Sequence, residues 1–262
     1  TNNATNAVIA VAATGTINIT GKVDAATANN NLGLEAVNGA ITIGGAVGSS
    51  AVAMGTLFAD GNTSFSANGT VTVGNLAIGV NIAPFATSIN FAEAVKVTGA
   101  DSSPTLSALT VNALSTGTIT FAKTIEVTNA AASIDIGSVN GLITVTGNIT
   151  GKDSVSITTS GSGAITLSGA ISTDAADGDI FIESTTGNVI TSGAISTSGT
   201  ASGVNSADIN IDTATSGNIT IGGNVSTSGG GDIILGADSA TGSSGTGNLT
   251  INGTVTTTGT AA

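Results

Sequence analysis

One line of sequence recurs along the chain, and this repetition constrains the fold more than any other feature. The phrase "GNITIGGNVSTSG" at 217–229 has near copies in "GLITVTGNITG" at 141–151 and "GAITLSGAIST" at 163–173. In each copy, apolar residues alternate with Thr, Ser or Asn, which is the period of a β-strand with one buried face. Successive copies begin 18 to 30 residues apart. The repetition therefore predicts a stack of similar units built from short strands.

Each copy centres on two apolar residues separated by one outward residue. In the C-terminal half, a second apolar run precedes this central pair and a third follows it, which gives three strands per repeat. The copy that begins at Val189 is irregular, because Ile190 interrupts the alternation. The other central pairs are Ile17/Ile19, Ile41/Ile43, Val71/Val73, Ile89/Phe91, Ile119/Phe121, Ile143/Val145, Ile165/Leu167, Ile219/Ile221 and Leu249/Ile251.

Three short strands in a repeat of roughly 25 residues are the pattern of one coil of a parallel β-solenoid. A sandwich of hairpins would place a strand about every 8–12 residues without a recurring threefold grouping. We therefore predict an all-β fold, a single parallel β-helix (β-solenoid) of about ten coils with roughly three short strands per coil. We expect one domain over 1–262, with irregular, longer loops at about 46–88 and the most regular repeats at 133–258.

The alternation also predicts what each side of a coil presents. Ile, Val and Leu should fill a narrow lumen, while Gly and Asn should occupy corners that need a positive φ. The outward residue of the central strand is mostly Thr, as in ice-binding solenoids, although the flanking positions vary too much for the paired Thr columns of that class. Lateral packing against another rod is our preferred interpretation. This outward column comprises Asn18, Thr42, Thr72, Asn90, Thr120, Thr144, Thr166, Ile190, Thr220 and Thr250.

Charge and composition exclude several classes of partner. The net charge is −12, and the four basic residues are all Lys. Nucleic-acid binding depends on clustered Lys and Arg, so we predict no nucleic-acid partner. No apolar run approaches the roughly 20 residues of a membrane span, so we predict no direct membrane insertion.

The side chains that usually carry catalysis are scarce. His, Cys, Arg and Tyr are all absent, so the many serines have no imidazole base. Asp174, Asp177 and Asp179 lie close together near Glu183, and sugar hydrolysis does use paired carboxylates. Solvated carboxylates on a turn explain this group more simply. We predict no catalytic residues, no required cofactor and no enzymatic activity.

A calcium site is the one metal hypothesis that the pattern supports. Asp179, Asp208 and Asp232 each stand immediately before the first inward residue of a coil, so stacking would bring them into one surface column. Carboxylate and carbonyl oxygens are the ligands that Ca²⁺ prefers. However, the nonapeptide repeat of calcium-binding solenoids is absent. A turn Asp that accepts backbone N–H groups is the alternative.

The two ends of the repeat suggest how copies interact. The first repeat contains "NAVIAVAATGTINIT" and the last contains "GNLTINGTVTTTGTAA", and both segments are in register with the other repeats. Neither shows the polar capping repeat that isolated repeat proteins carry. We expect either a segment of a longer solenoid or a contact in which the last coil of one copy stacks on the first coil of the next. Such a head-to-tail contact does not close and generates a filament.

At "GDIFIESTTGNVITSGAISTSG" and "ADINIDTATSGNITIGGNVSTSGGGDIIL", the chain resembles the repeat regions of filamentous-haemagglutinin-like adhesins, autotransporter passengers and β-solenoid surface-layer proteins. The resemblance covers most of 133–258. It implies a secreted, non-enzymatic solenoid at the cell surface.

These observations lead to a functional prediction. We expect a non-enzymatic extracellular structural protein that self-assembles, end to end and also laterally, into a cell-surface fibre or array. The alternative is an adhesin passenger segment that binds a cell-surface or glycan ligand through loops such as Ala46–Asn68. A polysaccharide-degrading enzyme that uses Asp174, Asp177 and Asp179 is the third possibility.

Overall fold

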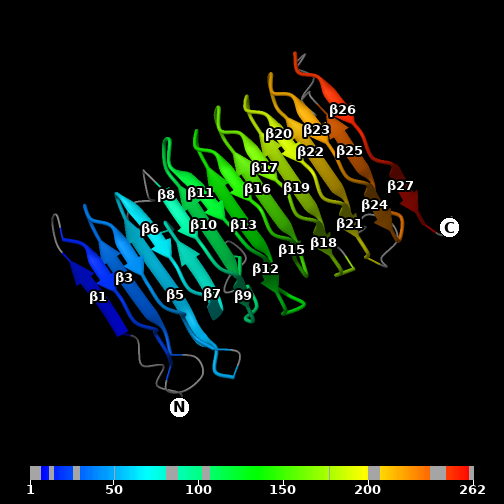
Figure 1. Cartoon of the computed structure of the whole chain (residues 1–262). Coiled ribbons are helices and arrows are strands. Elements are labelled where there is room, and N and C mark those ends of the chain that lie inside the picture. The colour runs from blue at the N-terminus through cyan, green and yellow to red at the C-terminus, as the bar shows by residue number, and fades with distance from the viewer. Residues whose placement is uncertain are drawn as a thin grey trace.

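The chain folds as a parallel β-helix, and the predicted fold class is confirmed. The computed structural model describes residues 7–11, 15–25, 30–49, 51–80, 88–101, 107–176, 178–199, 207–236 and 246–259. These stretches contain 27 strands and no helix, and every strand pairing among them is parallel. Figure 1 shows the strands stacked as rungs of a rod, from β1 at the N-terminal end to β27 at the C-terminal end.

The central strand of each coil belongs to one sheet, which we call the central sheet. Its ten strands follow chain order without a crossover, so the described residues form ten coils, as predicted. Its members are β2 (Ile17–Ile19), β4 (Ile41–Ile43), β6 (Ser64–Ala67), β8 (Ser88–Phe91), β11 (Thr118–Phe121), β14 (Ile143–Val145), β17 (Ile165–Leu167), β20 (Val189–Thr191), β23 (Ile219–Ile221) and β26 (Leu249–Ile251).

The strands that precede the central sheet in each coil stack into a second ladder, the leading column. Two of them are eight residues long and continue beyond this ladder. The members are β1 (Ala7–Val11), β3 (Leu32–Ala36), β5 (Met54–Gly61), the end of β7 (Val71–Ile78), β10 (Leu109–Ala113), β13 (Ile134–Ser138), β16 (Val155–Thr159), β19 (Ile180–Ser184), β22 (Ile209–Thr213) and β25 (Ile233–Gly236).

The strands that follow the central sheet form the trailing column. It begins with single bridges at Val23 and Val47. Because β7 pairs with β9 through its first residues and with β10 through its last, the leading and trailing columns join into one seventeen-stranded sheet. After the start of β7, its members are β9 (Val95–Val97), β12 (Ile125–Val127), β15 (Ile149–Thr150), β18 (Ile171–Thr173), β21 (Ile195–Thr197), β24 (Val225–Ser228) and β27 (Val255–Thr258).

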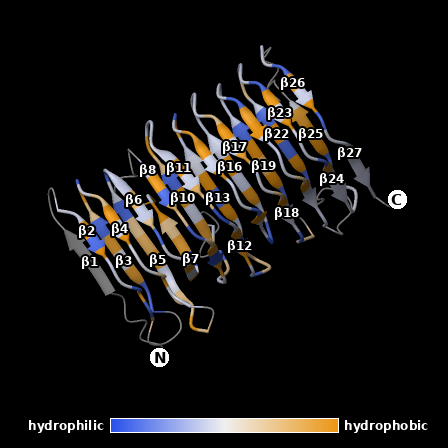
Figure 2. Cartoon of the chain, viewed as in Figure 1, coloured by the Kyte–Doolittle hydropathy of each residue, from blue (hydrophilic) through white to orange (hydrophobic). Residues whose placement is uncertain are grey.

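The core is a continuous stack of inward side chains from all three ladders. Apolar and polar residues alternate along the strands, as Figure 2 shows, and the inward residues of the middle coils are fully buried. Phe91 and Phe121 are ladder partners whose rings stack with centroids 4.6 Å apart, close to the spacing of the coils. Phe65 lies next to them at a centroid distance of 5.4 Å from Phe91. Rung stacking therefore brings like side chains together.

The structure corrects one column assignment. We placed Val71/Val73 in the central sheet, but these residues pair with Val95/Val97 of the trailing column. The central pair of this coil is Phe65/Ala67, which pairs with Ile41/Ile43 on one side. Both segments alternate with period 2, so only the ladder partners distinguish them. Ser66, not Thr72, therefore fills the outward central column in this coil.

This coil lies within the range 46–88, for which we expected longer loops. Much of that range is regular, because it contains β5, β6 and β7, and β5 and β7 are the longest described strands. Residues 81–87, including Pro84 and Phe85, lie outside the described residues.

Most corner glycines are required by close packing rather than by a positive φ, which corrects a second expectation. Among the described glycines, only Gly48, Gly79, Gly229 and Gly230 have a positive φ. A Cβ atom on Gly187 would instead lie 2.0 Å from the carbonyl oxygen of Gly163, and one on Gly217 would lie 1.9 Å from that of Gly187. Successive corners stack so closely that a side chain has no space.

Candidate functional site

The three aspartates predicted to stack do form one column at the start of the leading strands. The backbone N–H of Asp208 donates to Asp179 Oδ1 at 2.8 Å, and the N–H of Asp232 donates to Asp208 Oδ1 at 2.7 Å. Asp179 and Asp208 thus each accept a backbone amide of the next coil. The geometry matches the alternative that we gave, a turn Asp that bonds backbone N–H groups.

The calcium site at these aspartates stays a prediction. Within the described ranges, no group of three or more His, Cys, Asp or Glu is arranged to hold a metal ion. Of the three clustered aspartates, Asp174 lies 2.5 Å from Lys152 Nζ, Asp179 belongs to the stacked column, and Asp177 lies outside the described residues.

A second ladder, made by Asn side chains, was not predicted. It lies at the start of the central strand in the last three described coils. The N–H of Asn218 donates to Asn188 Oδ1 at 2.9 Å, and the N–H of Asn248 donates to Asn218 Oδ1 at 2.9 Å. The signal was present in the sequence, because Gly-Asn precedes the central pair in three consecutive repeats. As in the Asp column, a side-chain oxygen of one coil binds the backbone of the next.

Buried hydroxyl groups donate hydrogen bonds to backbone carbonyl groups at the corners of the coils, which was also not predicted. Thr213 donates to the Gly217 carbonyl at 2.9 Å, and Thr227 donates to the Gly231 carbonyl at 2.7 Å. Ser184 donates to the Gly163 carbonyl of the preceding coil at 2.8 Å. These hydroxyls satisfy corner carbonyl groups that lie away from water. The sequence signal for such a hydrogen bond is a Thr near the end of a strand with a Gly four residues later, as at Thr213 and Gly217.

The last described coil exposes residues of the core columns. Leu249 and Ile251 of β26 are each 39% exposed, and Val255 of β27 is 45% exposed. Their ladder partners in the coil below, Ile219, Ile221 and Val225, are all 0% exposed. The same inward positions therefore form an apolar surface at this end of the rod. Asp232 and Asn248 hold the corresponding places in the Asp and Asn ladders of this coil.

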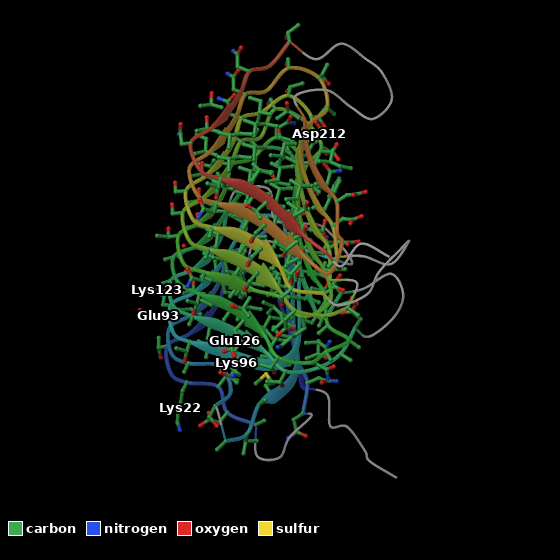
Figure 3. All side chains as sticks on the ribbon, turned by 90° about the vertical axis from the view of Figure 1, so that its right-hand side faces the viewer. Lys22, Glu93, Lys96, Lys123, Glu126 and Asp212 are labelled. Atoms are coloured by element: carbon green, nitrogen blue, oxygen red, sulfur yellow. The ribbon has the colours of Figure 1, made fainter. Side chains whose placement is uncertain are left out.

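Charged side chains on the strands lie on the seventeen-stranded sheet. Lys96 and Glu126 pair at 3.2 Å on the trailing column, on a different side of the rod from Asp212 in Figure 3. On the leading column, Glu183 lies beside Asp212 in the next coil. Burial, and secondarily the charge of Asp212, raises the pKa of Glu183, and burial alone raises that of Asp135. Neither arrangement combines a base with a nucleophile.

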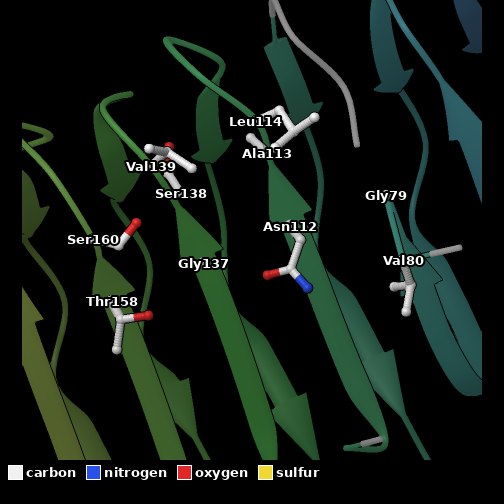
Figure 4. A pocket seen from close by; sticks show the side chains of 10 residues that line it. All are labelled: Gly79, Val80, Asn112, Ala113, Leu114, Gly137, Ser138, Val139, Thr158 and Ser160. Atoms are coloured by element: carbon white, nitrogen blue, oxygen red, sulfur yellow. The ribbon is translucent and has the colours of Figure 1, made fainter. Parts of the chain in front are cut away.

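Two shallow hollows lie on this sheet. One, of about 370 Å³, lies over the leading column, where Asn112 and Thr158 flank Gly137, as Figure 4 shows. A Cβ on Gly137 would lie 2.5 Å from Asn112 Oδ1, so the Asn112 side chain occupies the space above this glycine. The other, of about 450 Å³, is lined in part by Lys96, Glu126, Ala46, Gly48 and Ser49.

The fold and these surfaces define the protein as a parallel β-solenoid repeat protein. No protein-family model, curated protein or solved structure matches the chain. None of its described segments forms a helix long and apolar enough to cross a membrane.

Proposed function

We propose that this protein is an extracellular structural protein that polymerises end to end into a fibre or array at the cell surface. The observation that carries the proposal is the exposure of core-column residues at the last described coil. Leu249, Ile251 and Val255 continue columns that are fully buried one coil below. Apolar surface of this kind gains free energy when another coil covers it.

The backbone at this end supports the same contact. In the described residues, β26 pairs only with β23, and β2 at the opposite end pairs only with β4. An edge strand leaves one row of N–H and C=O groups without a ladder partner and so accepts another strand. In the ladders below, Asp and Asn oxygens accept the amides of the next coil, and Asp232 and Asn248 continue those ladders.

The first coil is a suitable occupant for this edge. Strand β2 presents Ile17, Asn18 and Ile19, in the same inward–outward–inward order as Leu249, Thr250 and Ile251. Stacking β2 of a second copy on β26 continues each column with a residue of similar kind. The two surfaces differ, so the contact is heterologous and extends into a filament.

Composition supports a surface location and a non-enzymatic role. The chain is rich in Gly, Thr, Ser and Asn and has no His, Cys, Arg or Tyr. These features, with the resemblance to adhesin and surface-layer repeats, favour a cell-surface structural protein that requires no cofactor.

Electron microscopy of negatively stained protein, with and without Ca²⁺, tests the proposal. We expect rods that lengthen with protein concentration. Replacing Ile251 with Lys puts a charge into the exposed core column and should leave rods no longer than one chain. The matched control is Thr256→Lys, which adds the same charge to an outward position of the same coil. Single rods of the unmodified protein under all conditions would reject end-to-end assembly.

The second hollow favours an adhesin as the alternative, because it combines an ion pair with residues of the predicted binding segment Ala46–Asn68. Deleting that segment would remove rungs, since β5 and β6 lie within it. The double variant K96A/E126A tests the alternative without removing a strand. An adhesin that binds here loses cell attachment while its circular dichroism spectrum is unchanged, and undiminished attachment argues against this site.

A further inference from the structure

We infer that the outer face of the central sheet is a lateral docking surface for a second copy of this chain. This inference goes beyond end-to-end assembly and does not depend on it. The face consists of the outward residue of each central strand and the two outward residues that flank that strand.

No position on this face is charged. The three columns of the face run along all ten coils, and each of their residues is at least partly exposed. The first column is Thr16, Ala40, Ser64, Ser88, Thr118, Leu142, Ala164, Asn188, Asn218 and Asn248; the second is Asn18, Thr42, Ser66, Asn90, Thr120, Thr144, Thr166, Ile190, Thr220 and Thr250; the third is Thr20, Gly44, Asn68, Ala92, Ala122, Thr146, Ser168, Ser192, Gly222 and Asn252.

The described strands of the other sheet carry all the strand charges. Because the chain has a net charge of −12, two copies repel one another over most of their surface. The uncharged face is where they meet with the least repulsion. The charged strand residues are Glu35, Asp60, Lys96, Glu126, Asp135, Glu183 and Asp212.

The face is large enough for a specific interface. Five residues across at about 3.3 Å each, and ten rungs at about 4.8 Å each, give roughly 800 Å². This area equals what one partner contributes to an interface of standard size, about 800 Å².

Two exposed aliphatic residues indicate how the copies align. Leu142 is 42% exposed and Ile190 is 39% exposed, and both stand among small polar residues. Leu142 immediately precedes β14 and Ile190 lies in β20, and these two strands lie on either side of β17. A two-fold axis at Thr166 of β17, perpendicular to the rod, places Leu142 of each copy over the rung that carries Ile190 of the other.

This arrangement is antiparallel and overlaps the seven strands from β8 to β26. It buries roughly 1,100 Å² in total, above the approximately 1,000 Å² that a specific interface needs. A crystalline polysaccharide fits the face less well, because no aromatic ring lies on it. Ice also fits less well, because the Thr column is interrupted by Asn18, Ser66, Asn90 and Ile190.

Sedimentation analysis tests the pairing on a chain that carries Ile251→Lys, which blocks end-to-end growth under the proposed function. We expect a monomer–dimer equilibrium. Adding L142K/I190K should weaken the dimer at least tenfold, while the matched control S172K/S226K, which adds the same charge on the trailing column, should not weaken it. The inference would be overturned if the Ile251→Lys chain were monomeric or if both sets of lysine substitutions weakened the dimer equally. Thermal hysteresis of the freezing point caused by the monomer would also overturn it, because that result would show that the face binds ice. End-to-end growth is assayed separately, so either proposal can fail alone.

The orientation is tested by one spin label, because the chain has no cysteine of its own. A label at N252C lies at the edge of the face in the last described coil. Antiparallel pairing centred on Thr166 separates the two labels by six rungs, roughly 29 Å along the rod. In-register parallel pairing leaves no separation between the two labels along the rod axis. A short distance in the dimer would overturn the two-fold arrangement.

Discussion

Glu183 of β19 lies directly beside Asp212 of β22, its ladder partner in the next coil. The two carboxylates lie on neighbouring rungs and face the same side of the sheet. Burial, and secondarily repulsion by Asp212, disfavours the charged form of Glu183. Ladder stacking, which brings like residues together in the core, here brings like charges together on the surface. The raised pKa of Glu183 follows from these two causes, burial first.

This pair predicts a pH-dependent stability. Because the folded pKa of Glu183 lies above its unfolded value, the folded chain binds the proton more tightly, and stability falls as the pH rises from the unfolded pKa through the folded one. We expect Glu183→Gln to raise the Tm by about 1–4 °C at neutral pH and to have little effect in acid. Thermal melts across pH test this. Glu126→Gln is the control, because its carboxylate pairs with Lys96; an equal rise there would contradict the explanation.

Corner glycines should be sensitive to the smallest side chain. In Gly217→Ala, the new Cβ lies 1.9 Å from the carbonyl oxygen of Gly187, so the two coils must separate. We expect a loss of about 2–4 kcal/mol in the free energy of unfolding. Gly21→Ala is the control, because nothing lies within 4 Å of its added Cβ. Denaturant unfolding measures both variants, and similar costs would show that stacking is not the reason.

The buried hydroxyl groups should matter more than exposed ones of the same kind. Thr213→Val keeps the shape of the side chain but removes the hydrogen bond to the Gly217 carbonyl. Leaving a buried acceptor unsatisfied costs about 1–3 kcal/mol. Thr220→Val, on the outer face of the central sheet, should change stability little. The comparison fails if the two substitutions destabilise the protein equally.

Truncating a side chain of the same core column should destabilise the protein more in the middle of the rod than at its end. Ile219 is 0% exposed, so Ile219→Ala should cost about 2–5 kcal/mol. Leu249, one coil further, is 39% exposed, and Leu249→Ala should cost much less in dispersed rods. If the proposed end-to-end assembly occurs, a second copy covers Leu249 in the fibre, and the two costs should converge there. Melting curves of dispersed and assembled protein decide this, and an unchanged difference would contradict end-to-end stacking.

Calcium binding at the Asp column can be separated from its hydrogen-bonding role. Asp208→Asn keeps the Oδ1 acceptor for the N–H of Asp232 but removes the negative charge. If the column only bonds backbone amides, the Tm of this variant should match that of the parent, with Ca²⁺ or with a chelator. A calcium-dependent rise in Tm that Asp208→Asn abolishes would establish the predicted site. Asp208→Ala, which also loses the acceptor, should cost about 1 kcal/mol in either case.

The sequence by itself determined the fold class and the contents of the lumen. Alternation with period 2, grouped in threes, buries one face of each strand only if successive coils stack, so the ten coils and the Asp column followed from the pattern. The resemblance at 133–258 pointed the same way.

Only the tertiary structure decided which equivalent segment occupies which ladder. Phe65/Ala67 and Val71/Val73 have the same period, and their ladder partners alone place the first in the central sheet and the second in the trailing column. Likewise, the need for glycine at Gly217 comes from a carbonyl thirty residues earlier, at Gly187. Local pattern fixes the direction in which a side chain points, but the contacts between coils are long-range, and a repeating sequence offers several nearly equal registers for them.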